Sequence, residues 1–223
     1  MTFDDHLWYT PAYIAKKGLE AIEFYKDKKM PSDVAAAIEE TQLAAVWAMG
    51  ARKATKLELY LQPVKETNPD VRVSCDVKSN SESFPFNGGI MEIEVTRYEE
   101  HANGNLSEFI INGKFKKQYA DETIILIALN KPGETSEGWK EISEKLAGCK
   151  VPYNVFLLGR MDGKYIIGRV YPKLDFLVPF NIKEEGSKEY TNPQGIKVVN
   201  LHYPSRTFSK HVPEGFNPFI DDV

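Results

Sequence analysis

The chain contains little cysteine, no long apolar run and no excess of positive charge. Among its 223 residues are 2 cysteines, and 28 lysines and arginines stand against 32 aspartates and glutamates, for a net charge of −4. Cys75 and Cys149 lie outside any CxxC motif, so we expect neither a disulfide framework nor a structural zinc site. No apolar run approaches the roughly 20 residues of a membrane helix, so no membrane partner is expected. The charge balance excludes a histone-like DNA-binding protein.

Several catalytic and targeting signatures are missing as well. The sequence has no GxGxxG, P-loop or GxSxG motif, which leaves nucleotide-binding and serine-hydrolase classes without support. The histidines are scattered and form no metal or triad motif. The first residues include Asp4 and Asp5 where a signal peptide would carry basic residues, so we expect no secretion signal and a cytoplasmic protein.

The composition that remains is typical of a globular protein. Hydrophobic residues make up 42% of the chain and charged residues 27%. Clear helix and strand patterns extend to Tyr171, and after Pro172 they weaken to short segments such as 196–201. We therefore expect a core over residues 1–171 and a C-terminal extension, 172–223, that packs on it.

Hydrophobic periodicity sets the order of the expected elements. Helices are predicted at residues 11–28, 32–50, 105–119 and 135–147. Strands are predicted at residues 57–64, 70–77, 90–98, 122–130, 153–160 and 164–171. The strand at 122–130 is continuously apolar, which indicates that it is covered on both faces. A meander of three strands, then a helix and this buried strand, predicts an α/β fold with a mixed sheet flanked by helices.

Acidic residues gather on one face of two consecutive strands. Strands 70–77 and 90–98 are expected to pair antiparallel, and a turn centred near residue 84 places Asp76 opposite Glu92, with Glu94 on the same face. Because like charges repel, this cluster requires a cation or a protonated member. Oxygen ligands of this type suit Mg²⁺ or Mn²⁺.

The helix at 32–50 offers a fourth acid. Glu39 shares a face with Leu43 and Val46, and that face is expected to pack on the sheet. Glu40 lies one residue round the helix and is expected to be solvated. Glu39 is therefore the candidate that joins the carboxylates of the strands.

The order αβββαβ, with an acid on the second strand and Glu-x-Glu on the third, resembles that of the restriction-endonuclease-like PD-(D/E)xK nucleases. The matching stretches are residues 68–76, Asn-Pro-Asp-Val-Arg-Val-Ser-Cys-Asp, and residues 91–95, Met-Glu-Ile-Glu-Val. Residues 105–119, which include Gln118 and Tyr119, and residues 123–129 resemble the segments that follow. The resemblance covers residues 33–171 and rests on topology and motif.

The resemblance implies a metal-dependent nuclease that hydrolyses phosphodiester bonds, with DNA as the expected substrate. It assigns Asp76 and Glu92 to Mg²⁺ (or Mn²⁺) and Glu94 to a second ion or, as base, to the attacking water. Glu39 would reach the same ion, directly or through water. Contacts to the phosphate backbone are expected from Arg97, Lys114, Lys116 and Lys117. A homodimer is expected only because many enzymes of this fold work as dimers.

The sequence departs from the family pattern in two ways. The lysine is missing, because Glu94 stands in its place, and Lys78, which shares strand parity with Asp76, is the candidate replacement. The proline–aspartate pair ends at Asp70, which leaves Asp70 as the alternative to Asp76. Pairing Asp70 with Glu92 would draw a proline and two glycines into a strand, so Asp76 is preferred.

Three other functions stay open. A catalytically inactive member of the same fold would serve as a binding or scaffold module, which the missing lysine favours. An unrelated α/β interaction protein would carry these acids as surface charge. A glycoside hydrolase would use Asp76 and Glu92 as an acid–base pair, although the tryptophans are spread along the chain and offer no stacking platform.

Overall fold

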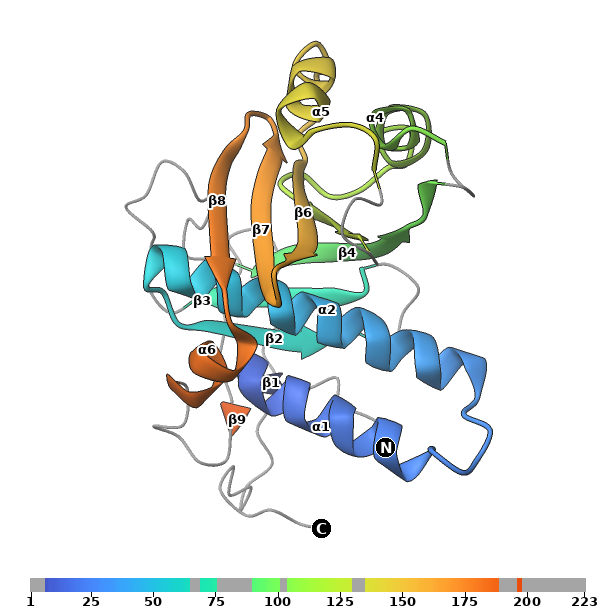
Figure 1. The fold of residues 1–223 in the computed structure, drawn as a ribbon, viewed down its shortest axis with the longest axis vertical. Coiled ribbons are helices and arrows are strands. Elements are labelled where there is room, and N and C mark those ends of the chain that lie inside the picture. The colour runs from blue at the N-terminus through green and yellow to red at the C-terminus, as the bar shows by residue number, and fades with distance from the viewer. Residues whose placement is uncertain are drawn as a thin grey trace.

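The structure describes six parts of the chain. A computed structural model places residues 7–64, 69–75, 90–100, 104–129, 135–188 and 196–197. Within these parts, nine strands form one mixed sheet with helices on both faces (Figure 1). The predicted class, an α/β fold with a mixed sheet flanked by helices, is confirmed.

The sheet has the strand order β8-β7-β6-β5-β4-β3-β2-β1-β9. In chain order, the strands are β1 (Trp8–Tyr9), β2 (Leu59–Pro63), β3 (Val71–Cys75), β4 (Ile90–Tyr98), β5 (Ile124–Leu129), β6 (Asn154–Met161), β7 (Lys164–Tyr171), β8 (Asp175–Phe180) and β9 (Ile196–Lys197). Strands β2, β3 and β4 form an antiparallel meander, β4, β5 and β6 are parallel, and β7 and β8 return antiparallel. All six strands predicted within the core are present.

The helices also follow the prediction in their order. They are α1 (Pro11–Phe24), α2 (Ser32–Thr55), α4 (Leu106–Phe109), which continues as the π-helical segment η1 (Ile110–Lys114), α5 (Trp139–Leu146) and α6 (Ile182–Lys188). Thr10 caps α1, because its hydroxyl accepts a hydrogen bond from the Tyr13 amide (3.3 Å). No helix in the described part of the chain is long and apolar enough to span a membrane.

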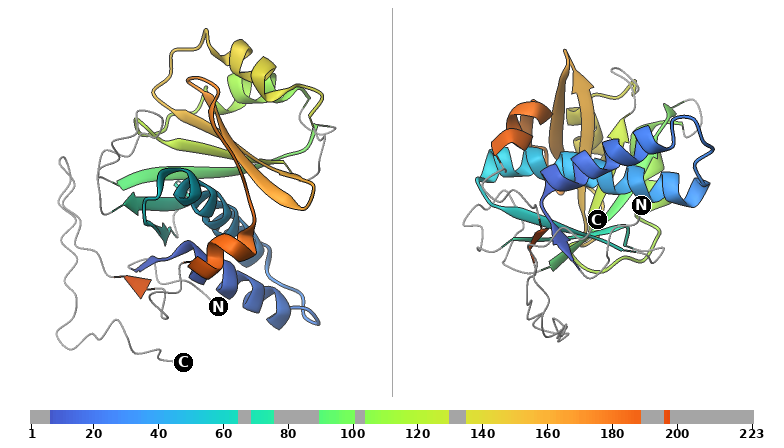
Figure 2. Two further views of the ribbon diagram at one scale, coloured as in Figure 1. Left: turned by 60° about the vertical axis from the view of Figure 1, so that its left-hand side comes forward. Right: turned by 90° about the horizontal axis from the view of Figure 1, so that it is seen from below.

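Helical crossovers connect the parallel strands. The chain leaves β4, passes through α4 and η1 and returns to β5, and α5 then connects β5 to β6. Helices α4 and α5 cover one face of the sheet, whereas α1, α2 and α6 lie on the other (Figure 2). The chain from β4 to β5 therefore passes over the face opposite α2.

Strand β5 separates two hydrophobic cores. Ile124 and Leu126 point into the core on the α2 side, and Ile125 and Ile127 point into the core on the α4–α5 side. All four side chains are fully buried. This confirms that the continuously apolar strand is covered on both faces.

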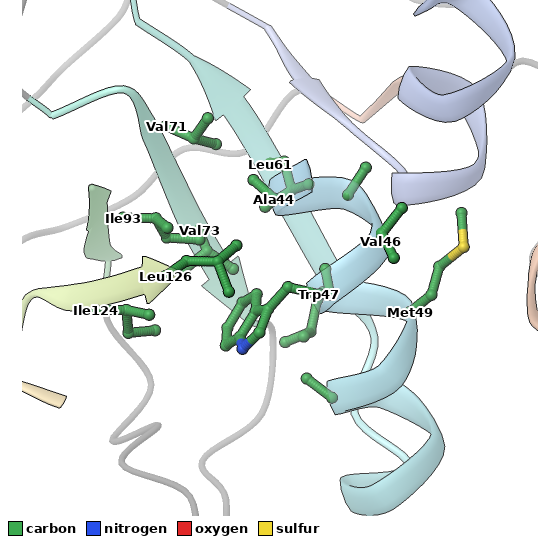
Figure 3. Packing of buried hydrophobic residues seen from close by; sticks show 14 of the residues in the cluster. Ala44, Val46, Trp47, Met49, Leu61, Val71, Val73, Ile93, Ile124 and Leu126 are labelled. Carbon is green, nitrogen blue, oxygen red and sulfur yellow. The ribbon is translucent and has the colours of Figure 1, made fainter. Parts of the chain in front are cut away.

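Helix α2 fits closely on the sheet around one large side chain. Trp47 is fully buried, and its ring meets Phe156 edge-on with 5.5 Å between the centroids. Figure 3 shows it pointing from α2 toward Ile124 and Leu126 of the sheet. Four alanines in the second half of this helix are equally buried, and their small size lets the backbone approach the strands. They are Ala44, Ala45, Ala48 and Ala51.

The region after Pro172 contains more regular structure than its sequence pattern indicates. β8 pairs with β7 at the edge of the sheet, and α6 packs on α2. Pro179 lies within β8, and proline weakens a strand pattern because it has no amide hydrogen to donate. An edge strand tolerates this loss. Of the predicted strand at 196–201, the structure describes β9, which pairs with β1.

Candidate functional site

The pairing of β3 with β4 decides which acids meet. We predicted Asp76 opposite Glu92, but the structure pairs Arg72 with Glu92 and Val71 with Ile93, so the predicted register was wrong by four residues (76 against 72). A shift by an even number of residues keeps every side chain on its face, and hence the period-two pattern could not distinguish the two registers. The observed register places a cation beside Glu92 and brings the beginning of β3 to the middle of β4.

Asp70, the alternative to Asp76, lies at this junction. It follows the buried Pro69 immediately before β3. Its Oδ2 accepts a hydrogen bond from the Val95 amide of β4 (2.6 Å). The carboxylate of Asp70 therefore lies next to Glu94, the residue before Val95. The proline–aspartate pair is the part of the sequence that marks this position.

Glu94 is the centre of the cluster. It is 8% exposed, and the atoms nearest its Oε1 include Lys114 Nζ at 3.3 Å and the Tyr119 hydroxyl at 3.4 Å. Lys117 Nζ lies 3.7 Å from the same oxygen. Lys114 also donates a hydrogen bond to the hydroxyl of Thr96, two residues further along β4. A buried carboxylate is costly unless cations and hydrogen-bond donors surround it, and these groups meet that need.

A π-helical turn carries Lys114 to the cluster. The Phe115 amide donates to the Ile110 carbonyl (2.9 Å), which closes the wider turn of η1. The helix predicted at 105–119 therefore ends at Lys114, and the residues after it form turns and irregular backbone. Burial lowers the pKa of Lys114, while the charge of Glu94 opposes this shift.

Glu40 of α2 is near enough to the cluster to respond to its charges. Burial, together with the negative charges of Asp70 and Glu94, raises its pKa from 4.5 to about 7. Burial also raises the pKa of Asp70 from 3.8 to about 6, and Glu94 adds to the shift, although the Val95 amide and nearby lysines oppose it. The expectation that Glu40 is a solvated acid was wrong, because it is half-buried and close enough to the acids of β3 and β4 to be affected by their charge.

The other predicted site residues lie elsewhere or outside the described residues. Asp76 and Lys78 belong to a part of the chain that the structure does not describe. Glu39 forms an ion pair with Arg97, so a predicted metal ligand faces a predicted phosphate contact. Lys116 is exposed. Of the three expected acids that the structure describes, Glu39, Glu92 and Glu94, only Glu94 lies in the observed cluster.

Sequence reasoning missed the part that three residues play in this cluster. It placed Glu40 in solvent, assigned Lys114 to the DNA backbone and gave Tyr119 no role. One signal was available: Lys114 and Lys117 are three residues apart, a spacing that puts two side chains on the same side of a helical turn. Nothing in the sequence shows that this side faces Glu94, because that depends on how α4 and η1 cross the sheet.

The carboxylates of the cluster are ligands of the type that hard divalent cations prefer. Asp70, Glu94 and Glu40 offer only oxygen ligands, and Mg²⁺ usually binds through one or two protein carboxylates completed by water and substrate phosphates. Among the described residues, no three His, Cys, Asp or Glu side chains are grouped closely enough to hold a metal ion by themselves. Asp70 and Glu94 are the adjacent pair. The raised pKa values of Asp70 and Glu40 arise from burial and from the negative charge of neighbouring acids, and a bound cation would offset both effects.

The two lysines that face Glu94 differ in their exposure. The side chain of Lys114 is 8% exposed, whereas that of Lys117 is 59% exposed. Lys117 can therefore meet an anion from solvent, while Lys114 acts inside the cluster. Carboxylates with raised pKa values beside an amine with a lowered pKa form a site suited to general acid–base chemistry on a bound anion.

Comparisons with known proteins identify no relative of this chain. No family model, curated protein or solved structure matches it. The assignment of a function therefore depends on the chemistry of the cluster formed by Glu40, Asp70, Glu94, Lys114, Lys117 and Tyr119, and on the resemblance of the sequence pattern.

Proposed function

We propose that this chain is a metal-dependent nuclease with a restriction-endonuclease-like core, and that DNA is its substrate. The observation that carries the proposal is the meeting of Asp70, Glu94 and Lys114 where β3 begins beside β4. Two carboxylates and a lysine are the three groups that the PD-(D/E)xK pattern brings together.

Lys114 replaces the lysine that the strand lacks. Because Asp70 lies beside Glu94, the pattern falls on Asp70 and on Glu94-Val95-Thr96, with Thr96 at the lysine position. Lys114 Nζ donates hydrogen bonds both to the Thr96 hydroxyl and to Glu94 Oε1. Its ammonium group therefore lies close to where a lysine on the strand would place its own. The missing lysine, which favours an inactive protein, has a substitute from η1.

The order of the elements supports the same proposal. The succession α2-β2-β3-β4-α4-β5 is αβββαβ, with β3 antiparallel to both neighbours and β5 parallel to β4. The resemblance implies an assisting acid on the first of these helices. Glu40 of α2 fits that role, since it is the acid of the helix whose pKa responds to Asp70 and Glu94.

Each residue of the cluster has a separate role in the proposed hydrolysis of a phosphodiester. Asp70 and Glu94, with Glu40 in reach, would hold Mg²⁺, which supplies a Lewis acid for the scissile phosphate and acidifies bound water. Lys114 orients the attacking water; burial lowers its pKa, although the charge of Glu94 opposes this shift. Its ammonium group donates to a phosphate oxygen and stabilises the charge that develops there.

Lys117 and Tyr119 both approach Glu94 Oε1, and we assign them different roles. Tyr119 is expected to keep its proton, because burial and the charge of Glu94 raise its pKa, so its hydroxyl continues to donate to Glu94. Lys117 is exposed and is the candidate for a direct contact with the DNA backbone. Lys116, on the adjacent turn, stays a further candidate for such a contact.

Two assays test the proposal. Calorimetry measures Mn²⁺ binding by the wild type and by Glu94→Gln, and cleavage of plasmid and of single-stranded oligonucleotides is followed with Mg²⁺ and with chelator. We expect the wild type to bind and cleave, and Glu94→Gln to lose about a hundredfold or more in cleavage. Glu92→Gln is the matched control, because it removes the same charge two residues earlier on β4, beside Arg72, and should keep both properties.

Each outcome has a defined meaning. A wild type that neither binds Mn²⁺ nor cleaves contradicts the proposed nuclease. Binding of Mn²⁺ without cleavage of any substrate favours the inactive binding module. Equal losses in Glu94→Gln and Glu92→Gln contradict the assignment of the site, because they would trace the effect to the charge of β4 in general.

A further inference from the structure

Tyr153 connects the sheet to the segment that carries Lys117 and Tyr119. It is buried and lies immediately before β6. Its hydroxyl accepts a hydrogen bond from the Tyr119 amide (3.2 Å) and donates one to the Lys117 carbonyl (3.2 Å). One side chain thus ties two backbone groups of this segment to the central sheet.

The segment needs such an anchor. Residues 115–120 follow the end of η1 and consist of turns and irregular backbone, so a regular ladder of backbone hydrogen bonds does not fix them. The ring of Tyr119 lies edge-on against that of Tyr153, with 5.2 Å between the centroids. The same Tyr119 donates its hydroxyl to Glu94 Oε1 (3.4 Å), and Lys117 Nζ approaches that oxygen.

We propose that Tyr153 is a positioning residue of the active site. Its hydroxyl fixes the backbone between Lys117 and Tyr119, so that the ammonium group of one and the hydroxyl of the other reach Glu94. The effect on cleavage rests on the proposed nuclease function, whereas the effect on the segment and on Mn²⁺ binding does not require cleavage. Tyr153 lies outside every motif in the sequence pattern, because its contribution depends on the neighbouring strand.

Tyr171 provides a matched control in the same chain. It is a buried tyrosine at the end of β7, and its hydroxyl donates to the Cys149 carbonyl (2.8 Å) and accepts from the Val151 amide (3.2 Å). It ties a turn to the sheet by the same chemistry as Tyr153. The turn at residues 149–151 carries none of the residues of the cluster.

The first measurement needs no catalytic activity. Tyr153→Phe and Tyr171→Phe each remove one buried hydroxyl, and amide hydrogen exchange is followed residue by residue by NMR. We expect Tyr153→Phe to speed exchange of the Tyr119 amide about threefold to tenfold and to leave the Val151 amide unchanged. Tyr171→Phe should do the reverse. An unchanged Tyr119 amide in Tyr153→Phe overturns the proposal.

The second measurement separates positioning from stability. Both variants should lower Tm by similar amounts, but only Tyr153→Phe should weaken Mn²⁺ binding and lower kcat/KM, by about tenfold to a hundredfold. In a Tyr119→Phe background, Tyr153→Phe should reduce Mn²⁺ binding and kcat/KM much less, because the Tyr119 hydroxyl that Tyr153 positions is already gone. Equal losses of Mn²⁺ binding in Tyr153→Phe and Tyr171→Phe overturn the proposal. A wild type that cleaves nothing contradicts the nuclease, while exchange and Mn²⁺ binding still decide the role of Tyr153.

Discussion

The two faces of strand β4 differ in what they contact: one is buried in a hydrophobic core, and the other carries the polar cluster. Met91, Ile93 and Val95 are buried in the core on the α2 side. Glu94 and Thr96 alternate with these residues along the strand, and both contact Lys114 on the side opposite α2. The apolar face is stabilised by removal of surface from water, which requires no individual partner, whereas the polar face depends on groups from several elements in defined positions. We therefore expect changes on the first face to reduce stability and changes on the second to reduce function.

The largest effect is expected from a substitution in the α2-side core, where the apolar face of β4 packs. Trp47→Ala removes a fully buried ring from the α2-side core and should lower the free energy of unfolding by about 3–5 kcal/mol. Urea unfolding measures this change. Leu19→Ala is the control, because that side chain is 65% exposed on α1, and it should stay within about 0.5 kcal/mol of the wild type. A loss in Trp47→Ala as small as in Leu19→Ala would contradict the packing of α2 on the sheet.

Lys114→Met is the corresponding change on the polar face. It keeps the bulk of the side chain and removes its charge, so cleavage should fall by about a hundredfold to ten-thousandfold. The free energy of unfolding should change far less than in Trp47→Ala, because Lys117 and Tyr119 still face Glu94. Cleavage and urea unfolding are measured on the same preparation. Lys140→Met, an exposed lysine paired with Glu144 on α5, is the control. Full activity in Lys114→Met would show that this lysine does not replace the missing one.

The pH dependence of Mn²⁺ binding tests which acids of the cluster take part in the polar site. Asp70 and Glu40 have pKa values raised to about 6 and about 7, so protons compete with a cation at mildly acid pH. We expect Mn²⁺ binding to tighten as the pH rises, by up to about tenfold per pH unit for each carboxyl that must lose a proton. Calorimetry at several pH values measures this slope. Glu40→Gln should flatten the profile near pH 7, and an identical profile in that variant would exclude Glu40 from the site.

The free energy of unfolding of the metal-free protein should fall as the pH rises, whereas Mn²⁺ binding tightens. Each of these carboxyls holds its proton more tightly in the folded state than in the unfolded state. Their stabilising contribution is therefore complete below the unfolded pKa values near 4 and is lost as the pH rises through about 6 to about 7. Urea unfolding of the wild type and of Glu40→Gln should accordingly diverge in favour of the variant as the pH rises from about 4.5 to about 7, and the difference should stay constant above that. A difference that is independent of pH would contradict the raised pKa of Glu40.

The smallest expected effect concerns the neighbouring acid of α2. Glu39 pairs with Arg97, and both side chains are partly exposed, so Glu39→Gln should lower the free energy of unfolding by less than about 1 kcal/mol. Cleavage should stay close to that of the wild type, whereas Glu40→Gln should reduce it. Measuring both variants side by side decides between the acid chosen from the sequence and the acid chosen from the structure. Loss of cleavage in Glu39→Gln alone would restore the first choice.

The accuracy of the sequence-based predictions differs between elements for physical reasons. The strand at 90–98 was predicted with its observed bounds, and the apolar strand β5 with its two covered faces, because alternation and continuous hydrophobicity are properties of a single segment. The register between β3 and β4 involves two segments. Any shift by two residues preserves the pattern of both strands, so the choice depended on keeping a proline and two glycines out of a strand, which favoured Asp76 over Asp70.

The lysine that we propose as the substitute for the missing one shows the same limit in another form. Lys114 is close to Glu94 in space but 20 residues away in sequence. Its position depends on the crossover from β4 to β5 and on the π-helical turn that ends it, and neither has a residue pattern that names the partner. Tyr153 is further away still, immediately before β6, and only the parallel pairing of β5 with β6 brings it to the segment at residues 115–120.

The sequence by itself determined the α/β class, the order of most elements and the presence of carboxylates on one face of β4, because these follow from periodicity and composition along the chain. It also marked Asp70 through the proline–aspartate pair. Only the tertiary structure decided that Asp70 lies beside Glu94, that Lys114 joins them and that Glu40 is near enough for its pKa to respond to both acids. The physical reason is that a site of this kind is formed by side chains from separate elements, and their distances are set by strand register and helix packing rather than by any local pattern.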